Sequence, residues 1–122
     1  MEETEMSRHL AFWKYNDGTY LDNPKVYETA CIDGKAVEGL ATLPVGDILN
    51  RASEIFSDYD KLDEYNYESP KGSFTIIADE QAVLFDCGWD MLETELNKII
   101  DLMDEFDCPF YDPQIETRFD GV

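Results

Sequence analysis

The chain has 122 residues and a formal net charge of −19, because 28 Asp and Glu residues face 9 Lys and Arg residues. That excess excludes direct binding to nucleic acid or to an anionic membrane, since both would repel the chain. The hydrophobic fraction of 43% is too high for a disordered acidic chain. We therefore expect one folded domain over residues 1–122, with residues 1–7 frayed.

The lack of targeting segments and the number of cysteines both indicate a protein of a reducing compartment. No stretch approaches the ~20 apolar residues of a membrane span, and the first residues lack the basic and apolar regions of a signal peptide. We therefore expect a cytoplasmic protein. Cys31, Cys87 and Cys108 are odd in number and widely spaced, so they are expected to be reduced, buried thiols.

The first third of the chain alternates strand-forming segments with turn residues. Residues 9–15 are rich in aromatic and aliphatic side chains, and the Asn-Asp-Gly sequence at 16–18 is typical of a tight turn, which predicts a hairpin. Residues 26–32 and 36–41 are expected to add strands on either side of a turn at 33–34.

Helical spacing of apolar residues appears next. It runs at i, i+3, i+4 and i+7 from Val45 to Tyr59, and Pro44 and Asp47 suit the first turn of a helix. The segments 65–69, 73–78 and 82–87 then predict a three-strand antiparallel meander.

A second apolar stripe predicts a second helix from Leu92 to Phe106, which Asp90 and Glu93 would open as a capping box. Residues 111–113 are expected to turn, and 115–119 to form an edge strand. The predicted fold class is α+β, with a mostly antiparallel sheet of about five to six strands and two helices packed on one face.

Motifs for catalysis are missing from the sequence. His9 is the only histidine, no serine or cysteine lies in a nucleophile motif, and neither a Walker loop nor Gly-x-Gly-x-x-Gly occurs. We expect no catalytic residue. The alternative is an enzyme or ligand-binding protein that uses carboxylates, for which Asp86, Asp90 and Asp112 are the candidates.

A calcium site was weighed at the densest group of acids. Residues 58–69 begin like an EF-hand loop. However, Leu62 replaces the third ligand, Asp63 replaces the turn glycine, and Ser69 stands where the bidentate Glu belongs. We expect no metal and no cofactor.

The distribution of acids relative to the helix ends is more informative. A carboxylate at the negative end of a helix dipole costs on the order of 0.3–1 kcal/mol, yet acids crowd both predicted ends. Only Lys61 opposes those after the first helix, and no Lys or Arg lies among those that end the second. Chains tend to break local rules at functional sites, so we expect the two ends to form one acidic surface for a partner. In the alternative interpretation, these acids serve solubility alone and solvent screens them over ~8 Å.

Tyrosines lie among these acids, and tyrosine is enriched at protein interfaces. Tyr65 and Tyr67 share one face of a predicted strand and are expected in the core, whereas Tyr59 is expected to be half-buried. The candidate partner-binding residues are Asp58, Tyr59, Asp60, Asp63, Glu64, Glu68, Asp101, Asp104, Glu105, Asp107, Tyr111 and Asp112.

In size, acidity and the absence of secretion and catalytic motifs, the chain resembles the small acidic α/β immunity proteins that neutralise bacterial toxins, including nuclease inhibitors of the barstar kind. The resemblance implies a basic protein partner, such as a toxin or nuclease domain, and no direct contact with nucleic acid or membrane. No motif carries it, so no site residue follows from it. Phage-encoded nucleic-acid mimics that block restriction or CRISPR enzymes share this composition and are an alternative.

Overall fold

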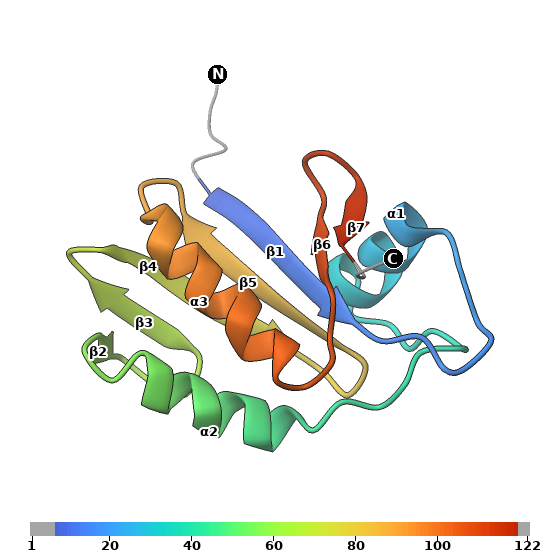
Figure 1. Ribbon diagram of the computed structural model, residues 1–122, viewed down its shortest axis with the longest axis horizontal. Coiled ribbons are helices and arrows are strands. Elements are labelled where there is room, and N and C mark those ends of the chain that lie inside the picture. Colours follow the sequence, from blue (N-terminus) through green and yellow to red (C-terminus); the bar gives the residue numbers. More distant parts are fainter. Residues whose placement is uncertain (1–6, 120–122) are drawn as a thin grey trace.

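The computed structural model describes residues 7–119, which fold into one antiparallel seven-stranded sheet in the order β2-β3-β4-β5-β1-β6-β7 (Figure 1). The predicted α+β class and antiparallel sheet are confirmed, but the sheet has more strands than expected. The frayed segment predicted at 1–7 lies outside the described residues except for Ser7, where β1 begins. The strands are β1 (Ser7–Trp13), β2 (Asp60–Lys61), β3 (Asn66–Ser69), β4 (Gly72–Ala78), β5 (Ala82–Gly88), β6 (Phe110–Asp112) and β7 (Thr117–Phe119).

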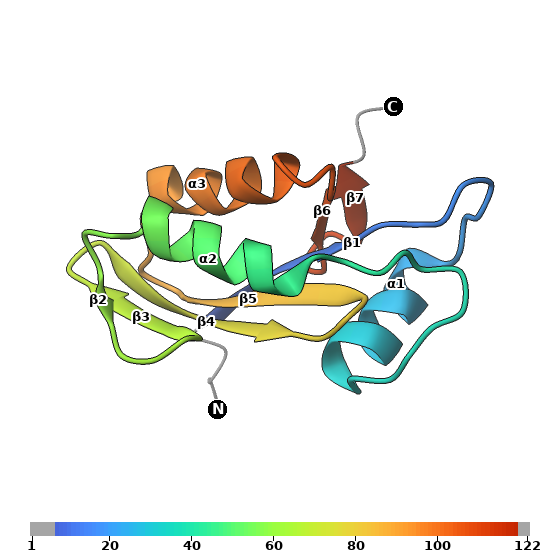
Figure 2. The same ribbon diagram turned by 90° about the horizontal axis from the view of Figure 1, so that it is seen from below.

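Helices cover both faces of the sheet (Figure 2). α2 and α3 lie on one face, as predicted, and a helical segment made of α1 and the π-helical turn η1 lies on the other. Within residues 7–119, no helix combines the length and the apolar character needed to cross a membrane. The bounds are α1 (Asn23–Val26), η1 (Tyr27–Ile32), α2 (Val45–Ile55) and α3 (Glu93–Asp104).

The first strand in sequence, β1, lies inside the sheet because it pairs with β5 along its whole length and with β6 on its other edge. Successive side chains of a strand point to opposite faces, so Leu10 and Phe12 face α2 and α3 while Ala11 and Trp13 face η1. All four are buried, with at most 1% of their surface exposed. One strand therefore contributes to two hydrophobic cores.

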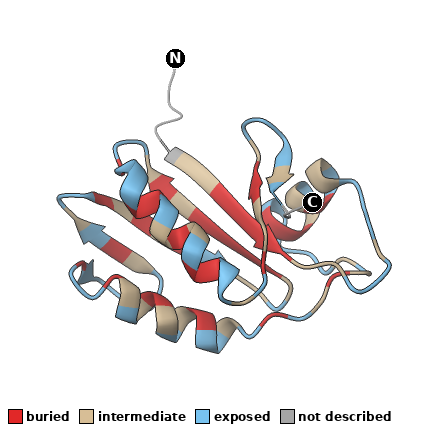
Figure 3. Ribbon diagram, viewed as in Figure 1, coloured by how far each residue is buried: buried red, intermediate tan, exposed pale blue. Residues whose placement is uncertain are grey.

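The larger core lies between the sheet and the pair α2 and α3, where Figure 3 shows the buried positions of both helices turned toward the strands. These positions confirm both predicted helices and the meander of β3, β4 and β5. The large side chains buried here include Phe12, Phe56, Tyr59, Tyr67, Phe74, Phe85, Ile48, Ile99, Leu102 and Met103.

The smaller core shows that the strand expected at 26–32 is wrong. Val26, Ala30 and Cys31 pack against Trp13 and the other buried residues of this face, and the segment is helical. Their separations of four and five residues suit a helix with a wide turn, and a proline in the first turn of α1 fixes the helical φ there.

The hairpin expected after β1 does not form, although its turn does. The amide of Thr19 donates to the Asn16 carbonyl at 2.9 Å, and Gly18 has the positive φ of 79° that the turn needs. The chain then enters α1, and 36–41 contributes a single bridge between Tyr15 and Leu40 instead of a strand. Because β5 and β6 occupy both edges of β1, no edge remains for a neighbouring hairpin strand.

Two boundaries near α3 also differ from expectation. The helix begins after Leu92, whose backbone is extended and whose side chain makes no capping bond, while Asp90 lies in the preceding turn. The capping box is therefore wrong. Residues 110–112 form β6 instead of a turn, and the edge strand expected at 115–119 is confirmed as β7.

The three cysteines are free and buried, as expected. Burial raises the pKa of the Cys31, Cys87 and Cys108 thiols to about 12 in each case. Because the thiolate is the reactive form, we predict that a colorimetric disulfide reagent at pH 8 leaves all three thiols unreacted in the native protein. All three should react in denaturant, and fast native reaction of any one would contradict its burial.

Two buried tyrosines offer a second, matched test of the fold. The Tyr59 hydroxyl donates to Oε1 of Glu95 at 2.9 Å, and Glu95 is only 3% exposed, whereas the Tyr67 hydroxyl has no hydrogen-bond partner among the described protein atoms. We expect Tyr59→Phe to lower the free energy of unfolding by about 1.5–3 kcal/mol, because the lost bond is to a charged acceptor. Tyr67→Phe should leave it unchanged or raise it by about 1 kcal/mol. Urea unfolding measures both, and equal losses would contradict the assignment.

Candidate functional site

The acids that follow the two long helices lie at opposite ends of the helical layer. α2 and α3 run in opposite directions across the sheet, so the exit of α2 lies beside the start of α3 (Figures 1 and 2). Two contacts mark this junction: the Tyr59 hydroxyl bonds Glu95, and the amide of Leu92 donates to the Lys71 carbonyl at 3.1 Å. The single surface expected from the sequence is therefore two separate clusters.

At the exit of α2, two of the predicted residues have structural roles. Asp58 accepts a hydrogen bond from Nζ of Lys71 at 2.7 Å, which lowers the pKa of the Asp58 carboxyl. Oδ1 of Asp63 accepts the backbone amides of Tyr65 and Asn66 at 2.8 and 2.9 Å, and these bonds lower the pKa of Asp63. Asp63 thus builds the turn that leads into β3.

The remaining acids of this cluster, Asp60, Glu64 and Glu68, are exposed. Asp60 lies directly opposite Glu68 across β2 and β3, an arrangement of like charges that destabilises the pair. Tyr67 is 1% exposed and confirms the predicted core position, but Tyr65 is 44% exposed. Tyr65 escapes the core because β3 begins one residue later, at Asn66.

Three predicted partner-binding residues are buried. Tyr59 belongs to the larger core, and Tyr111 packs in the smaller core with its ring centroid 5.0 Å from that of Trp13. Asp112 is 6% exposed and lies 3.7 Å from an Arg8 nitrogen. Because Tyr59, Tyr111 and Asp112 are buried, their side chains are not available to a partner.

The end of α3 keeps the exposed acids that the sequence predicted. Asp101, Asp104 and Asp107 are exposed, and none forms a side-chain hydrogen bond or ion pair with a residue in 7–119. Glu105 is different, since its two oxygens accept Nε and Nη2 of Arg51 at 2.9 and 3.1 Å. This fork lowers the pKa of Glu105. We call the first three residues the α3 acidic cluster.

Cations from distant parts of the chain approach this helix end, although no Lys or Arg lies near it in the sequence. Arg51 comes from α2, and Nζ of Lys14, just after β1, donates to the Phe106 carbonyl at 3.3 Å. A cation at the last carbonyls of a helix offsets its negative dipole end. Neither contact could be predicted from residues close to α3 in the sequence, because Lys14 follows β1 and Arg51 belongs to α2.

Asp107 breaks two local rules at once. Its φ of 57° lies in the left-handed region, where glycine is favoured after a helix, and the amide of Cys108 closes the helix end on the Met103 carbonyl at 3.1 Å. Its carboxylate also stands at the negative end of the dipole. Stability alone would favour glycine or asparagine here.

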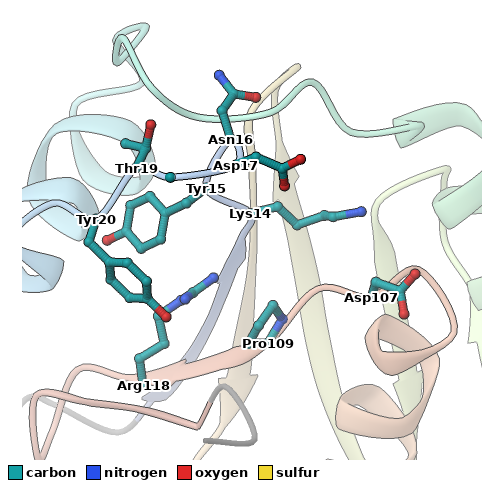
Figure 4. A pocket seen from close by; sticks show the side chains of 10 residues that line it. Lys14, Tyr15, Asn16, Asp17, Thr19, Tyr20, Asp107, Pro109 and Arg118 are labelled. Carbon is teal, nitrogen blue, oxygen red and sulfur yellow. The ribbon is translucent and has the colours of Figure 1, made fainter.

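A hollow of about 280 Å³ adjoins Asp107 and bounds the acidic surface (Figure 4). Lys14 and Asp107 lie on one side of it, and Arg118 lies with Tyr15 and Tyr20 on the other. The Arg118 guanidinium stacks over the Tyr15 ring at 4.7 Å and donates to the Trp13 carbonyl at 2.8 Å. The hollow is therefore of mixed charge, with two cations, Lys14 and Arg118, and two acids, Asp17 and Asp107, in its lining.

Two of the three carboxylates of the enzyme alternative, Asp86 and Asp112, do not meet. Nε2 of His9 lies 3.5 Å from Asp86, and Nδ1 of His9 lies 2.7 Å from the Tyr27 hydroxyl. Arg8, the residue before His9 in β1, contacts Asp112, so Asp86 and Asp112 lie on opposite faces of the sheet. Within 7–119, no group of three or more His, Cys, Asp or Glu side chains is placed to hold a metal ion.

Comparison with known proteins assigns no family to this fold. No protein-family model matches the chain, and no curated protein matches it. The function is therefore inferred from the charge and geometry of the described residues.

The ion pair at the end of α3 makes a prediction about pH. Glu105 has a lowered native pKa, so its stabilising contribution is present above the unfolded pKa and is lost as pH falls through the native pKa. In Arg51→Gln, carbon NMR titration should show the Glu105 pKa rising toward its ordinary value. Lys25→Gln, which removes an exposed cation from α1 on the other face, is the control. An unchanged Glu105 pKa in Arg51→Gln would contradict the pairing.

Proposed function

We propose that this chain is an acidic binding protein that inhibits a basic, nucleic-acid-directed protein such as a bacterial toxin, acting in the cytoplasm as its immunity protein. The observation that carries the proposal is the α3 acidic cluster. Its three carboxylates are exposed and have no ionic partner within 7–119. Lys14 offsets part of the helix dipole at this end, but it does not pair with any of the three carboxylates. A cationic partner would neutralise these unpaired charges on binding.

Inhibition follows from charge complementarity. A nucleic-acid-directed protein presents Lys and Arg side chains to phosphates. The α3 acidic cluster would occupy those cations and exclude the nucleic acid, and the net charge of −19 would speed the encounter. Carboxylates that are desolvated when they pair with Lys or Arg of the partner would make the binding specific for that partner.

The separation of the two clusters supports an inhibitor over a nucleic-acid mimic. A mimic needs carboxylates at regular phosphate spacing over a long surface. Here Asp58 and Glu105 are paired with Lys71 and Arg51, Asp63 is used in a turn, and the exposed remainder lies at two ends of the helical layer. An inhibitor requires only one patch fitted to one active site.

Capture followed by an activity assay tests this function. The immobilised chain should retain a basic protein from an extract of its source cell, and the purified partner should cleave or bind nucleic acid until one equivalent of this chain is added. Affinity should fall at least about tenfold between 50 and 500 mM salt. Capture of a restriction or CRISPR enzyme would favour mimicry, and salt-independent affinity would overturn the electrostatic basis.

Charge reversal locates the surface. The double variant Asp101→Lys with Asp104→Lys should slow association about tenfold or more, without changing the circular dichroism spectrum. Asp60→Lys with Glu68→Lys makes the same change in net charge at the opposite end, where it exchanges one like-charge pair for another. Equal slowing by both double variants would mean that net charge alone acts, and would contradict the assignment to α3.

A further inference from the structure

An apolar groove lies beside the α3 acidic cluster, between α3 and the strands β6 and β7. Figure 2 shows these two strands next to the end of α3. Its volume is about 330 Å³. Because α2 and α3 cover the sheet only as far as β1, the helix-side face of β6 and β7 is left open here. We call this hollow the α3–β7 groove; it is lined by Ile100, Asp104, Cys108, Pro109, Phe110 and Phe119.

Two stacked phenylalanines make up the strand side of the groove. The rings of Phe110 and Phe119 are 5.5 Å apart and inclined by 15°, and Phe110 also contacts Phe12 of the larger core at 5.8 Å. Phe119 nevertheless stays 52% exposed. An aromatic ring that is anchored to the core but half open to solvent provides a rigid site for another apolar side chain.

The outer edge of β7 borders the same groove. β7 is the last strand of the sheet order, so its outer backbone groups pair with no described strand. Side chains alternate along it: Phe119 faces the groove, whereas Arg118 stacks on Tyr15 on the other face. An extended segment that pairs with β7 would therefore place every second side chain toward Phe119 and Asp104.

Charge decides what kind of segment fits. Among residues 7–119, Asp104 is the only charged side chain in the groove lining, and Asp101 lies one helical turn earlier. Glu116, also exposed, lies just before β7. A second copy of this chain would bring a net charge of −19 against another −19, which opposes self-association through this face. A segment with basic residues on either side of an apolar one matches the groove instead.

We propose that the α3–β7 groove receives an extended segment of the basic partner, pairs with it along β7, and holds one apolar side chain of that segment against Phe119 while a flanking Lys or Arg meets Asp104. This inference rests on the proposed function and specifies its docking site. The α3 acidic cluster attracts the partner, and the groove supplies the desolvated contact that fixes its register.

Three synthetic peptides test the groove without knowledge of the partner. The first is acetyl-Thr-Lys-Thr-Leu-Thr-Lys-Thr-amide, in which Lys, Leu and Lys share one face of an extended chain. The second replaces Leu by Ser, and the third replaces both Lys by Glu. In nitrogen-15 NMR titrations, the first should shift the amides of residues 117–119 and bind at least about tenfold more tightly than either control. Equal binding of the Leu and Ser peptides would overturn the proposal.

Variants of the chain supply matched controls. Phe119→Ala should weaken the Leu peptide about tenfold, whereas Ile115→Ala, which truncates a 60% exposed apolar residue on the same hairpin, should not. Asp104→Asn does not disturb packing and should weaken binding and reduce its salt dependence, with the exposed Asp60→Asn as control. Equal effects of each variant and its control would overturn the groove as the site.

The remaining outcomes separate the groove from the proposed function. Inhibition lost in the Asp101 and Asp104 double reversal but intact in Phe119→Ala would overturn the groove and leave the function standing. Peptide binding at β7 without any inhibition by the chain would overturn the function alone. A dimer in analytical ultracentrifugation that Phe119→Ala dissolves would show that a second copy occupies the groove, and would overturn the proposal.

Discussion

The pairing of β1 with β5 and β6 is the constraint on which the rest of the structure depends. This single strand supplies Leu10 and Phe12 to one core and Ala11 and Trp13 to the other, and all four are almost fully buried. Both helical layers pack on it, and β6 pairs with it on one edge and with β7 on the other. The cluster and the groove at the end of α3 therefore depend on seven residues near the start of the described chain.

Elements defined by local periodicity were predictable from the sequence. The apolar stripe of α2 and the alternation of β4 and β5 are set by neighbouring residues, and each buries one face against the same core. The segment 26–32 was not predictable in this way. Its residues suit a strand by propensity, but β1 has no vacant edge and the face around Trp13 is left to be covered, so tertiary packing selects a helix.

In the candidate site, too, some features follow from neighbouring residues and others from tertiary packing. The exposure of Asp101 and Asp104 follows from their places opposite the buried stripe of α3, which the sequence reveals. The partners Arg51 for Glu105 and Lys14 for the Phe106 carbonyl come from other elements, and no spacing along the chain indicates them. The α3–β7 groove could not be predicted from the sequence either, because it forms between α3 and two strands, β6 and β7, that this helix does not cover.

The two edges of the sheet differ in a way that limits assembly. At one edge, β2 has only two residues, and its Asp60 lies opposite Glu68 of β3. A short edge strand with negative charge disfavours pairing with an added strand. At the other edge, Phe119 of β7 adjoins an apolar groove. If a partner strand adds at β7 as proposed, the β2 edge would not accept a second one, and strand addition would end after one partner.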